Sequence, residues 1–132
     1  MSKALKRFLI VDDDPQNNLL SKLALKKSFG EVQINDFVIP EIGLEFIESE
    51  FTNIQPQEKI TLFLDINMPT MTGWEFLEKF GQFKKSLKEQ FSIYILSSSV
   101  DPTDINRAKA NPHVIDFIEK PLSMATLLKM FA

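Results

Sequence analysis

Three consecutive aspartates, Asp12, Asp13 and Asp14, follow an apolar run at residues 8–11, and a fourth, Asp65, ends a second apolar run. Two carboxylates about 4 Å apart repel each other by about 4 kcal/mol at an effective dielectric constant of about 20, so crowded aspartates need a cation. Oxygen ligands without histidine or cysteine favour Mg²⁺ or Mn²⁺ over zinc. Magnesium usually keeps several waters, which leaves positions for a phosphate oxygen. The aspartates therefore predict a site for a hard divalent cation, with a phosphoryl group as its natural partner.

Two further polar residues end apolar stretches in the second half of the chain. Ser97 follows residues 92–96, and Lys120 follows residues 114–118 and precedes Pro121. A lysine at a strand end near carboxylates supplies a positive charge from the protein itself. The alternative for Lys120 is an ordinary surface lysine, which is the usual environment of this residue type. Its place before a proline at the end of a predicted strand favours the site.

The elements that position these residues alternate between strand and helix along the chain. Short continuous apolar runs indicate strands buried on both faces, and apolar residues at intervals of three and four indicate helices. Parallel strands need crossover connections, so the alternation predicts a parallel sheet with helices on both faces. The predicted strands are residues 8–11, 32–38, 60–64, 92–96 and 114–118, and the predicted helices begin at Pro15, Glu41, Gly73, Asp101 and Ser123.

The first predicted helix has clear boundary signals. Asp14 fits its N-cap, Pro15 its first position and Gly30 its end. Residues 80–91 are long for one helix and its connection, and Gly81 indicates a break or an extra turn. The inward-facing residues expected in the first helix are Leu19, Leu20, Leu23, Ala24 and Phe29, and those expected in the last helix are Leu127, Leu128 and Phe131.

In an open parallel sheet, ligands bind outside the carboxyl ends of the strands. Asp12 and Asp13, then Asp65, Ser97 and Lys120, each follow one of the predicted strands. The fold therefore predicts that these side chains meet at one edge of the sheet. The alternative for the first two aspartates is that they are helix-start acids, which the helix dipole favours.

Composition limits what else the chain can do. With 132 residues, 44% of them hydrophobic and 25% charged, it is long enough for one ordinary core, and we expect a single globular domain. The absence of cysteine excludes disulfides and thiolate chemistry. The net charge is -3 and the lysines are mixed with acids, so we expect no direct nucleic-acid binding. No apolar stretch is long enough for a membrane span or a secretory signal, so we expect a cytoplasmic protein without membrane contact.

The stretches "VDDDP", "LDINMPTMTG", "LSSS" and "EKP", in this order and at successive strand ends, resemble the receiver domain of two-component response regulators, the CheY-like superfamily. The resemblance covers essentially the whole chain. It implies a flavodoxin-like (βα)5 fold, with a doubly wound five-stranded parallel sheet in a three-layer α/β/α arrangement. We expect residues 5–132 to form one stand-alone receiver domain after an N-terminal tail at residues 1–4.

The resemblance also implies a function. A receiver accepts a phosphoryl group from a sensor histidine kinase or a histidine phosphotransfer protein and then acts on a downstream protein target, so it is a signalling switch and not an ordinary enzyme. Asp65 would be the phospho-acceptor, with Asp13 a direct Mg²⁺ ligand and Asp12 a ligand through water. Asn67 would give its backbone carbonyl to the metal. Lys120 would pair with the phosphoryl oxygens.

Four further residues have switch or supporting roles by the same resemblance. Ser97 corresponds to the family's switch Ser or Thr hydroxyl, and Phe117 occupies the aromatic switch position. Pro121 would follow a cis peptide bond, and Ser99 would influence hydrolysis of the phosphoryl group. The protein-binding face that changes would be formed by the fourth predicted helix, the fifth strand and the fifth helix.

Three other functions fit parts of the pattern. A haloacid-dehalogenase-like phosphatase would also use Asp65 as a nucleophile, but such sites have a second aspartate two residues on, where this chain has Asn67, and they carry cap insertions. A flavin-binding flavodoxin-like protein would need a Ser-, Thr- or Gly-rich phosphate loop after the first strand, and aspartates there repel phosphate. A receiver unable to accept phosphate is disfavoured because each required residue type is present.

The chain also has Ile39-Pro40 where relatives often have a turn such as Asn-Gly, so we expect a reshaped loop there.

Overall fold

The computed structural model of the chain describes residues 6–52 and 59–131, so the N-terminal tail expected at residues 1–4 lies outside the described residues. Within those ranges, no helix is long and apolar enough to cross a membrane. Each predicted strand is present, with ends that differ by at most two residues. The strands are β1 (Lys6–Val11), β2 (Val32–Phe37), β3 (Ile60–Leu64), β4 (Phe91–Ser97) and β5 (Val114–Glu119), and the helices are α1 (Pro15–Phe29), α2 (Pro40–Phe51), α3 (Gly73–Gly81), α4 (Lys85–Lys88), α5 (Pro102–Ala110) and α6 (Met124–Met130).

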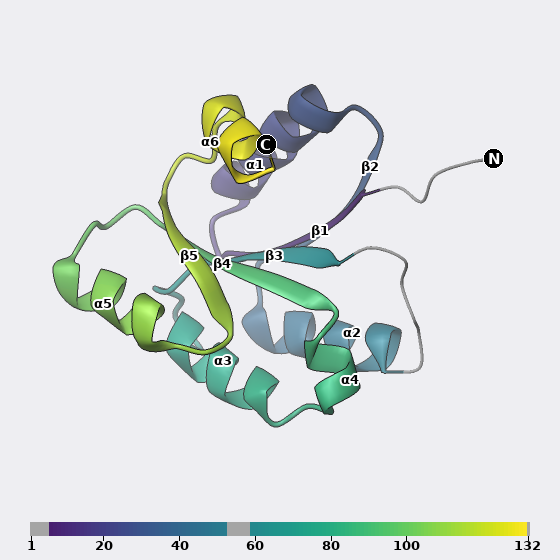
Figure 1. Cartoon of the computed structure of the whole chain (residues 1–132), viewed down its shortest axis with the longest axis vertical. Helices are drawn as coiled ribbons and strands as arrows, with labels where there is room; N and C mark the ends of the chain where they lie inside the picture. The colour runs from purple at the N-terminus through teal and green to yellow at the C-terminus, as the bar shows by residue number, and fades with distance from the viewer. Residues whose placement is uncertain (1–5, 53–58, 132) are drawn as a thin grey trace.

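The five strands form one parallel sheet in the order β2-β1-β3-β4-β5, with helices on both faces (Figure 1). This arrangement confirms the predicted doubly wound, three-layer fold. Strand β1 pairs with β2 on one side and with β3 on the other, so the direction of strand addition reverses there. In doubly wound sheets, the crevice at such a reversal is the usual ligand site. The carboxyl ends of β1 and β3 flank it here.

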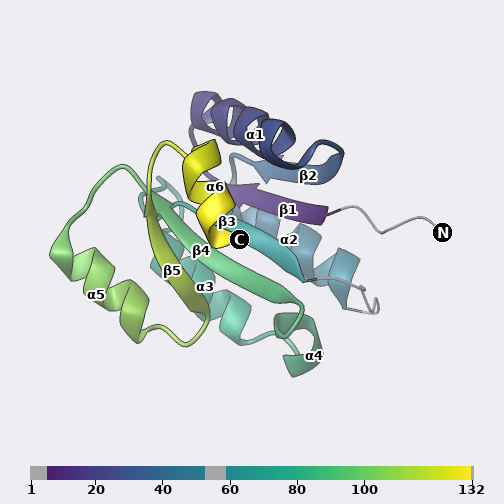
Figure 2. The ribbon, with the colours of Figure 1, turned by 45° about the horizontal axis from the view of Figure 1, so that its top comes forward.

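A hydrophobic core fills each face of the sheet. Helices α1 and α6 lie side by side over one face, and α2, α3, α4 and α5 cover the other (Figure 2). Side chains alternate along β1 as a strand requires: Phe8 and Ile10 belong to the core under α1 and α6, whereas Leu9 and Val11 belong to the core on the other face. All residues of β3 are buried, which fits a strand covered on both sides.

Three of the five residues predicted to face inward from helix α1 are exposed. Leu19, Leu20 and Leu23 are 56%, 53% and 47% exposed, so the expectation that they pack inward is wrong. Asp14 caps the helix as predicted, because its side chain accepts the N–H of Gln16 at 2.9 Å. This cap fixes where α1 begins and therefore which of its residues face the sheet. The buried residues of α1 are Asn17, Asn18, Ser21 and Leu25.

The remaining inward predictions for α1 and α6 hold in part. Ala24 and Phe29 of α1 are partly buried and pack against the core under these two helices. In α6, Leu127 is fully buried, but Leu128 is 55% exposed, so its predicted inward position is wrong. Phe131 is partly buried in the same core.

The helix predicted to begin at Gly73 is in fact two helices, so the break expected near Gly81 is confirmed. α3 ends at Gly81, and α4 begins at Lys85. The side chain of Lys88 donates a hydrogen bond to the carbonyl of Gly81 at 2.8 Å, which fastens α4 to the end of α3. Because α4 is an added helix, the fourth and fifth predicted helices are α5 and α6.

Candidate functional site

The predicted site residues meet at the carboxyl ends of the strands. Asp12 directly follows β1, Asp65 follows β3, Ser97 ends β4 and Lys120 follows β5. Asp12, Asp13 and Asp65 each offer one carboxylate oxygen, and these three atoms lie within 4.8 Å of one another. The ammonium nitrogen of Lys120 lies 2.7 Å from Asp12 Oδ2 and 3.4 Å from Asp65 Oδ1. The structure therefore joins the predicted acidic cluster and its lysine in one site.

Asp12 is enclosed by hydrogen-bond donors and is only 1% exposed. Its Oδ1 accepts the main-chain N–H of Asp14 at 3.0 Å. Its Oδ2 accepts from the side-chain amide of Asn17 at 2.6 Å as well as from Lys120. Its main-chain carbonyl accepts from the side-chain amide of Asn18 at 3.0 Å. Each oxygen of this buried residue thus has a donor, as buried polar groups require.

Burial and the charges of the site together shift two pKa values. Burial, followed by the negative charge of Asp12, raises the pKa of Asp65 from 3.8 to about 6, although the nearby positive charge of Lys120 partly opposes this. Burial alone would lower the pKa of Lys120, but its hydrogen bond to Asp12 and the charges of both carboxylates outweigh burial and raise it above its usual value. Asp65 is therefore a carboxylate whose ionisation falls close to neutral pH.

The donor set of the cluster fits a hard divalent cation. Asp12, Asp13 and Asp65 offer only oxygen atoms, and within the described residues this acidic cluster includes no histidine or cysteine. Oxygen-only sites of this kind suit Mg²⁺ and Mn²⁺. A cation would also offset the mutual repulsion of the three carboxylates, which a single lysine cannot fully neutralise.

The ends of β4 and β5 are joined beside the cluster. Ser97 is 1% exposed, and its hydroxyl oxygen accepts the N–H of Ser99 at 3.1 Å. The main-chain N–H of Lys120 donates to the carbonyl of Ser97 at 2.7 Å. The peptide bond between Lys120 and Pro121 is cis. Phe117 is half-buried on β5 and packs against the core covered by α2 to α5.

The loop that carries Asn67 is held by close backbone contacts. Asn67 itself is exposed. The N–H of Gly73 donates to the carbonyl of Ile66 at 2.8 Å, and a Cβ atom added at Gly73 would lie 2.6 Å from the carbonyl oxygen of Asp65. Only glycine fits at such a close approach. The start of α3 therefore lies directly against the backbone that bears Asp65.

Two residues of the site, Asn17 and Asn18, were not predicted. Both are buried, and both donate side-chain hydrogen bonds to Asp12. A signal was present in the sequence, since two adjacent amides occur in the first turn of a helix that follows an acidic stretch. The three exposed leucines of α1 obscured it, because their spacing indicated that a different side of the helix faces the sheet.

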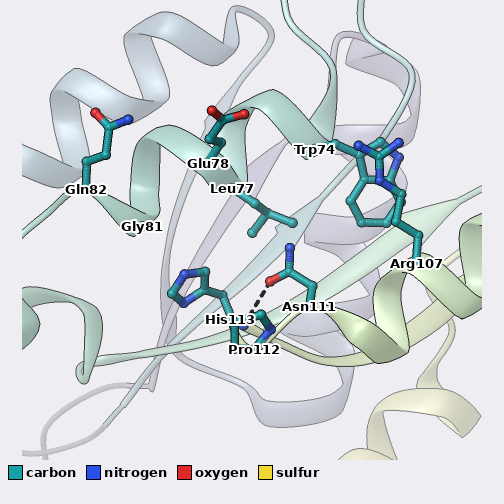
Figure 3. Close-up of a pocket in the computed structure, with 9 residues that line it drawn as sticks. All are labelled: Trp74, Leu77, Glu78, Gly81, Gln82, Arg107, Asn111, Pro112 and His113. Carbon is teal, nitrogen blue, oxygen red and sulfur yellow. Dashed lines mark hydrogen bonds between the residues drawn. The ribbon is translucent and has the colours of Figure 1, made fainter.

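A separate hollow of about 500 Å³ lies between α3 and the loop that leads into β5 (Figure 3). The guanidinium of Arg107 lies over the ring of Trp74, 4.7 Å from its centre. Leu77 points into the hollow from α3, and on the opposite side Asn111 accepts the N–H of His113 at 2.9 Å (Figure 3). No member of the acidic cluster lines this hollow, so it is distinct from the site at the strand ends.

Comparison with known proteins identifies the same class of protein that the sequence motifs resemble, the response regulator receiver domain. The family model of the response regulator receiver domain matches residues 8–132. A two-component response regulator from Cytophaga hutchinsonii is similar in structure, with a TM-score of 0.85, 26% sequence identity, and coverage of 98% of this chain and 96% of that chain. A response regulator receiver protein from Dyadobacter fermentans has a TM-score of 0.85, 28% identity, and coverage of 96% and 94%. A search of curated protein sequences found no match.

Because the family model spans nearly the whole chain, the protein belongs to the response regulator receiver domains, the CheY-like receivers of two-component systems. Receiver domains are signalling switches. The cluster of Asp12, Asp13 and Asp65 fits the phosphorylation site of such a domain.

Proposed function

We propose that the chain is a phospho-accepting receiver in which Asp65 takes a phosphoryl group from the phosphohistidine of a sensor histidine kinase or a histidine phosphotransfer protein. The observation that carries this proposal is the position of Asp65, with an oxygen 3.4 Å from the ammonium of Lys120 and its carboxylate within the acidic cluster. A pKa of about 6 leaves most of Asp65 ionised at neutral pH. An ionised carboxylate is the form that can act as a nucleophile.

In the transfer step, an oxygen of Asp65 attacks phosphorus in line with the departing imidazole nitrogen. The new P–O bond forms as the P–N bond breaks, and the electron pair of the broken bond stays on the imidazole. Lys120 neutralises negative charge on the phosphoryl oxygens. When bound, Mg²⁺ adds further neutralisation and orients those oxygens. Asp13 and Asp65 would hold the metal directly, and Asp12 would act through water. The main-chain carbonyl of Asn67 would complete the protein ligands.

The output of the switch depends on Ser97 and Phe117. Ser97 ends β4, and its main-chain carbonyl accepts the N–H of Lys120; its hydroxyl would turn toward the phosphoryl oxygens. Phe117 would then move into the space that Ser97 leaves. The face formed by α5, β5 and α6 changes shape as a result, and a downstream protein target binds this altered face. Phosphorylation thereby shifts the population between two packings of the same chain.

The test is incubation with acetyl phosphate and Mg²⁺, followed by intact mass measurement. We expect one added phosphoryl group, which is absent in Asp65→Ala and absent when the metal is chelated. Asp116→Ala is the matched control, because Asp116 is an exposed residue of β5 that lies outside the cluster, and this variant should still be modified. Persistence of the label in Asp65→Ala would move the acceptor elsewhere. Sustained release of phosphate from small esters would favour a haloacid-dehalogenase-like phosphatase instead.

A further inference from the structure

Asn17 holds the carboxylate of Asp12 from within α1. It is the third residue of that helix and is 7% exposed. Its side-chain amide donates to Asp12 Oδ2 over 2.6 Å, and the ammonium of Lys120 lies 2.7 Å from the same oxygen. A single carboxylate oxygen therefore has two donors, one neutral and one charged.

Lys120 is shared between two carboxylates, and the sharing is uneven. Its nitrogen is closer to Asp12 Oδ2, at 2.7 Å, than to Asp65 Oδ1, at 3.4 Å. A phosphoryl group carries more negative charge than the carboxylate to which it is attached, so it attracts the ammonium away from Asp12. A buried carboxylate that loses its donors retains the full cost of desolvation. Oδ1 of Asp12 keeps the main-chain N–H of Asp14, but once Lys120 has turned away, the donor left to Oδ2 is the amide of Asn17, which must then stay in place during the switch.

We propose that Asn17 is a positioning residue that keeps Asp12 hydrogen-bonded and in place while Lys120 turns toward the phosphoryl group on Asp65. This proposal rests on the proposed function of Asp65. The amide suits the role because it is neutral, so the phosphoryl charge attracts it much less than the ammonium. Its position is fixed by the Asp14 cap, which sets the start of α1.

Asn18 offers a matched comparison on the same helix turn. It is 1% exposed, and its amide donates to the main-chain carbonyl of Asp12 at 3.0 Å, not to the carboxylate. Asn18 thus fastens α1 to the end of β1 without supporting the charge of Asp12. If Asn17 were only another fastening, Asn17→Ala and Asn18→Ala would behave alike in every assay.

The experiment compares both alanine variants with the wild type in three measurements. These are urea unfolding without metal, Mg²⁺ binding to the unphosphorylated protein by calorimetry, and binding of trifluoroberyllate, a phosphoryl mimic, in the presence of Mg²⁺. We expect similar losses of unfolding free energy and retained Mg²⁺ binding in both variants. Asn17→Ala should bind trifluoroberyllate about tenfold more weakly, the scale of a lost hydrogen bond to a charged group, whereas Asn18→Ala should change that affinity by less than about twofold.

Equal weakening of trifluoroberyllate binding in the two variants, or none in Asn17→Ala, would overturn the proposal. A wild-type protein that binds no trifluoroberyllate and accepts no phosphate would instead refute the proposed function of Asp65. If Asn17→Ala does not fold, Asn17→Ser keeps a donor hydroxyl and should bind the mimic with intermediate affinity. In the wild type, nitrogen NMR should show the Lys120 amine resonance shifting on addition of the mimic while the Asn17 amide protons remain protected from exchange. Loss of that protection would also overturn the proposal.

Discussion

Lys120 lies 2.7 Å from Asp12 Oδ2, although its own strand, β5, is separated from β1 in the sheet by β3 and β4. The pair therefore spans the carboxyl edge of the sheet, over the ends of two intervening strands. Asp12 is almost fully buried, and the lysine side chain is 15% exposed. Neither charge can be removed without leaving the other in a poorly solvated place.

Removing the lysine should destabilise the metal-free protein. We expect Lys120→Ala to lower the free energy of unfolding by about 3 kcal/mol, because Asp12 and Asp65 lose their cation in a buried setting. Urea unfolding in the presence of a chelator measures this. The control is Lys129→Ala, which removes an exposed lysine on α6 and should change the free energy of unfolding by less than about 0.5 kcal/mol. Lys120→Ala should still bind Mg²⁺ but respond weakly to phosphate, and full activation of that variant would contradict the assigned role.

Asp65 should make the metal-free stability depend on pH. Its pKa is about 6 in the folded protein and near 3.8 when unfolded, so the folded state binds the proton more tightly. The unfolding free energy should therefore be highest at low pH in this window and fall as pH rises from about 4 through about 6. Urea unfolding across this range measures the slope, and Asp65→Asn should remove this residue's share of it. An unchanged slope in Asp65→Asn would show that another group titrates there.

Mg²⁺ binding should have the opposite pH dependence. The metal needs the ionised carboxylate, so it competes with the proton on Asp65. With a pKa of about 6, the apparent affinity should be about tenfold weaker at pH 5 than at pH 7. Calorimetric titration at constant ionic strength measures it. Equal affinity at the two pH values would mean that Asp65 is not a ligand or that its pKa is not raised.

Gly73 should tolerate no side chain. A Cβ atom there would lie 2.6 Å from the Asp65 carbonyl oxygen and 2.9 Å from Ile66 Cα, both rigid backbone atoms. Gly73→Ala should therefore cost about 3 kcal/mol of stability and also weaken Mg²⁺ binding by displacing Asp65. Gly30→Ala is the control, because Gly30 has a φ of 75° and no atom within 4 Å of its added Cβ. It should lose about 1–2 kcal/mol through backbone strain and bind Mg²⁺ normally. Unchanged Mg²⁺ binding in Gly73→Ala would argue against this coupling.

Trp74 should report the position of α5, since Arg107 of that helix stacks on its ring. Arg107→Ala should change the fluorescence of this single tryptophan while costing about 0.5–1 kcal/mol, as exposed cation–π contacts do. If phosphorylation of Asp65 displaces α5, acetyl phosphate with Mg²⁺ should change the emission in the wild type far more than in Arg107→Ala. Lys109→Ala, an exposed change on the same helix, should keep the wild-type response. If the emission changed equally in Arg107→Ala and Lys109→Ala, the fluorescence change would not depend on the contact between Arg107 and Trp74.

The strands of the sheet could be predicted from the sequence because each one is marked by a local run of apolar residues. The largely apolar run at residues 60–64 predicts a strand buried on both faces, and the structure has β3 at the same residues with every one of them buried. Parallel strands then bring their carboxyl ends to one edge, so Asp12, Asp65 and Lys120 could be expected to meet before any distance was known. Gly81 likewise marked the end of α3.

The sequence was insufficient where a helix could face the sheet in more than one way. In α1, Leu19 and Leu23 have the spacing of a buried stripe, yet they face outward, and Asn17 and Ser21 face inward. The cap at Asp14 and the need of a buried carboxylate for donors decide the orientation, and both act through tertiary contacts that periodicity does not report. The sequence also could not show that Lys120 lies closer to Asp12 than to Asp65, because this difference too depends on tertiary contacts.

Because the strands of the sheet are far apart in the sequence, the anionic part of this site is translated long before its lysine. A ribosome-bound chain that ends before β5 already contains Asp12 and Asp65, but it lacks Lys120, whose ammonium lies next to both carboxylates in the folded protein. Domains generally fold as units during synthesis. The charge balance of this edge of the sheet is therefore complete only once Lys120, which follows the last strand, has been added.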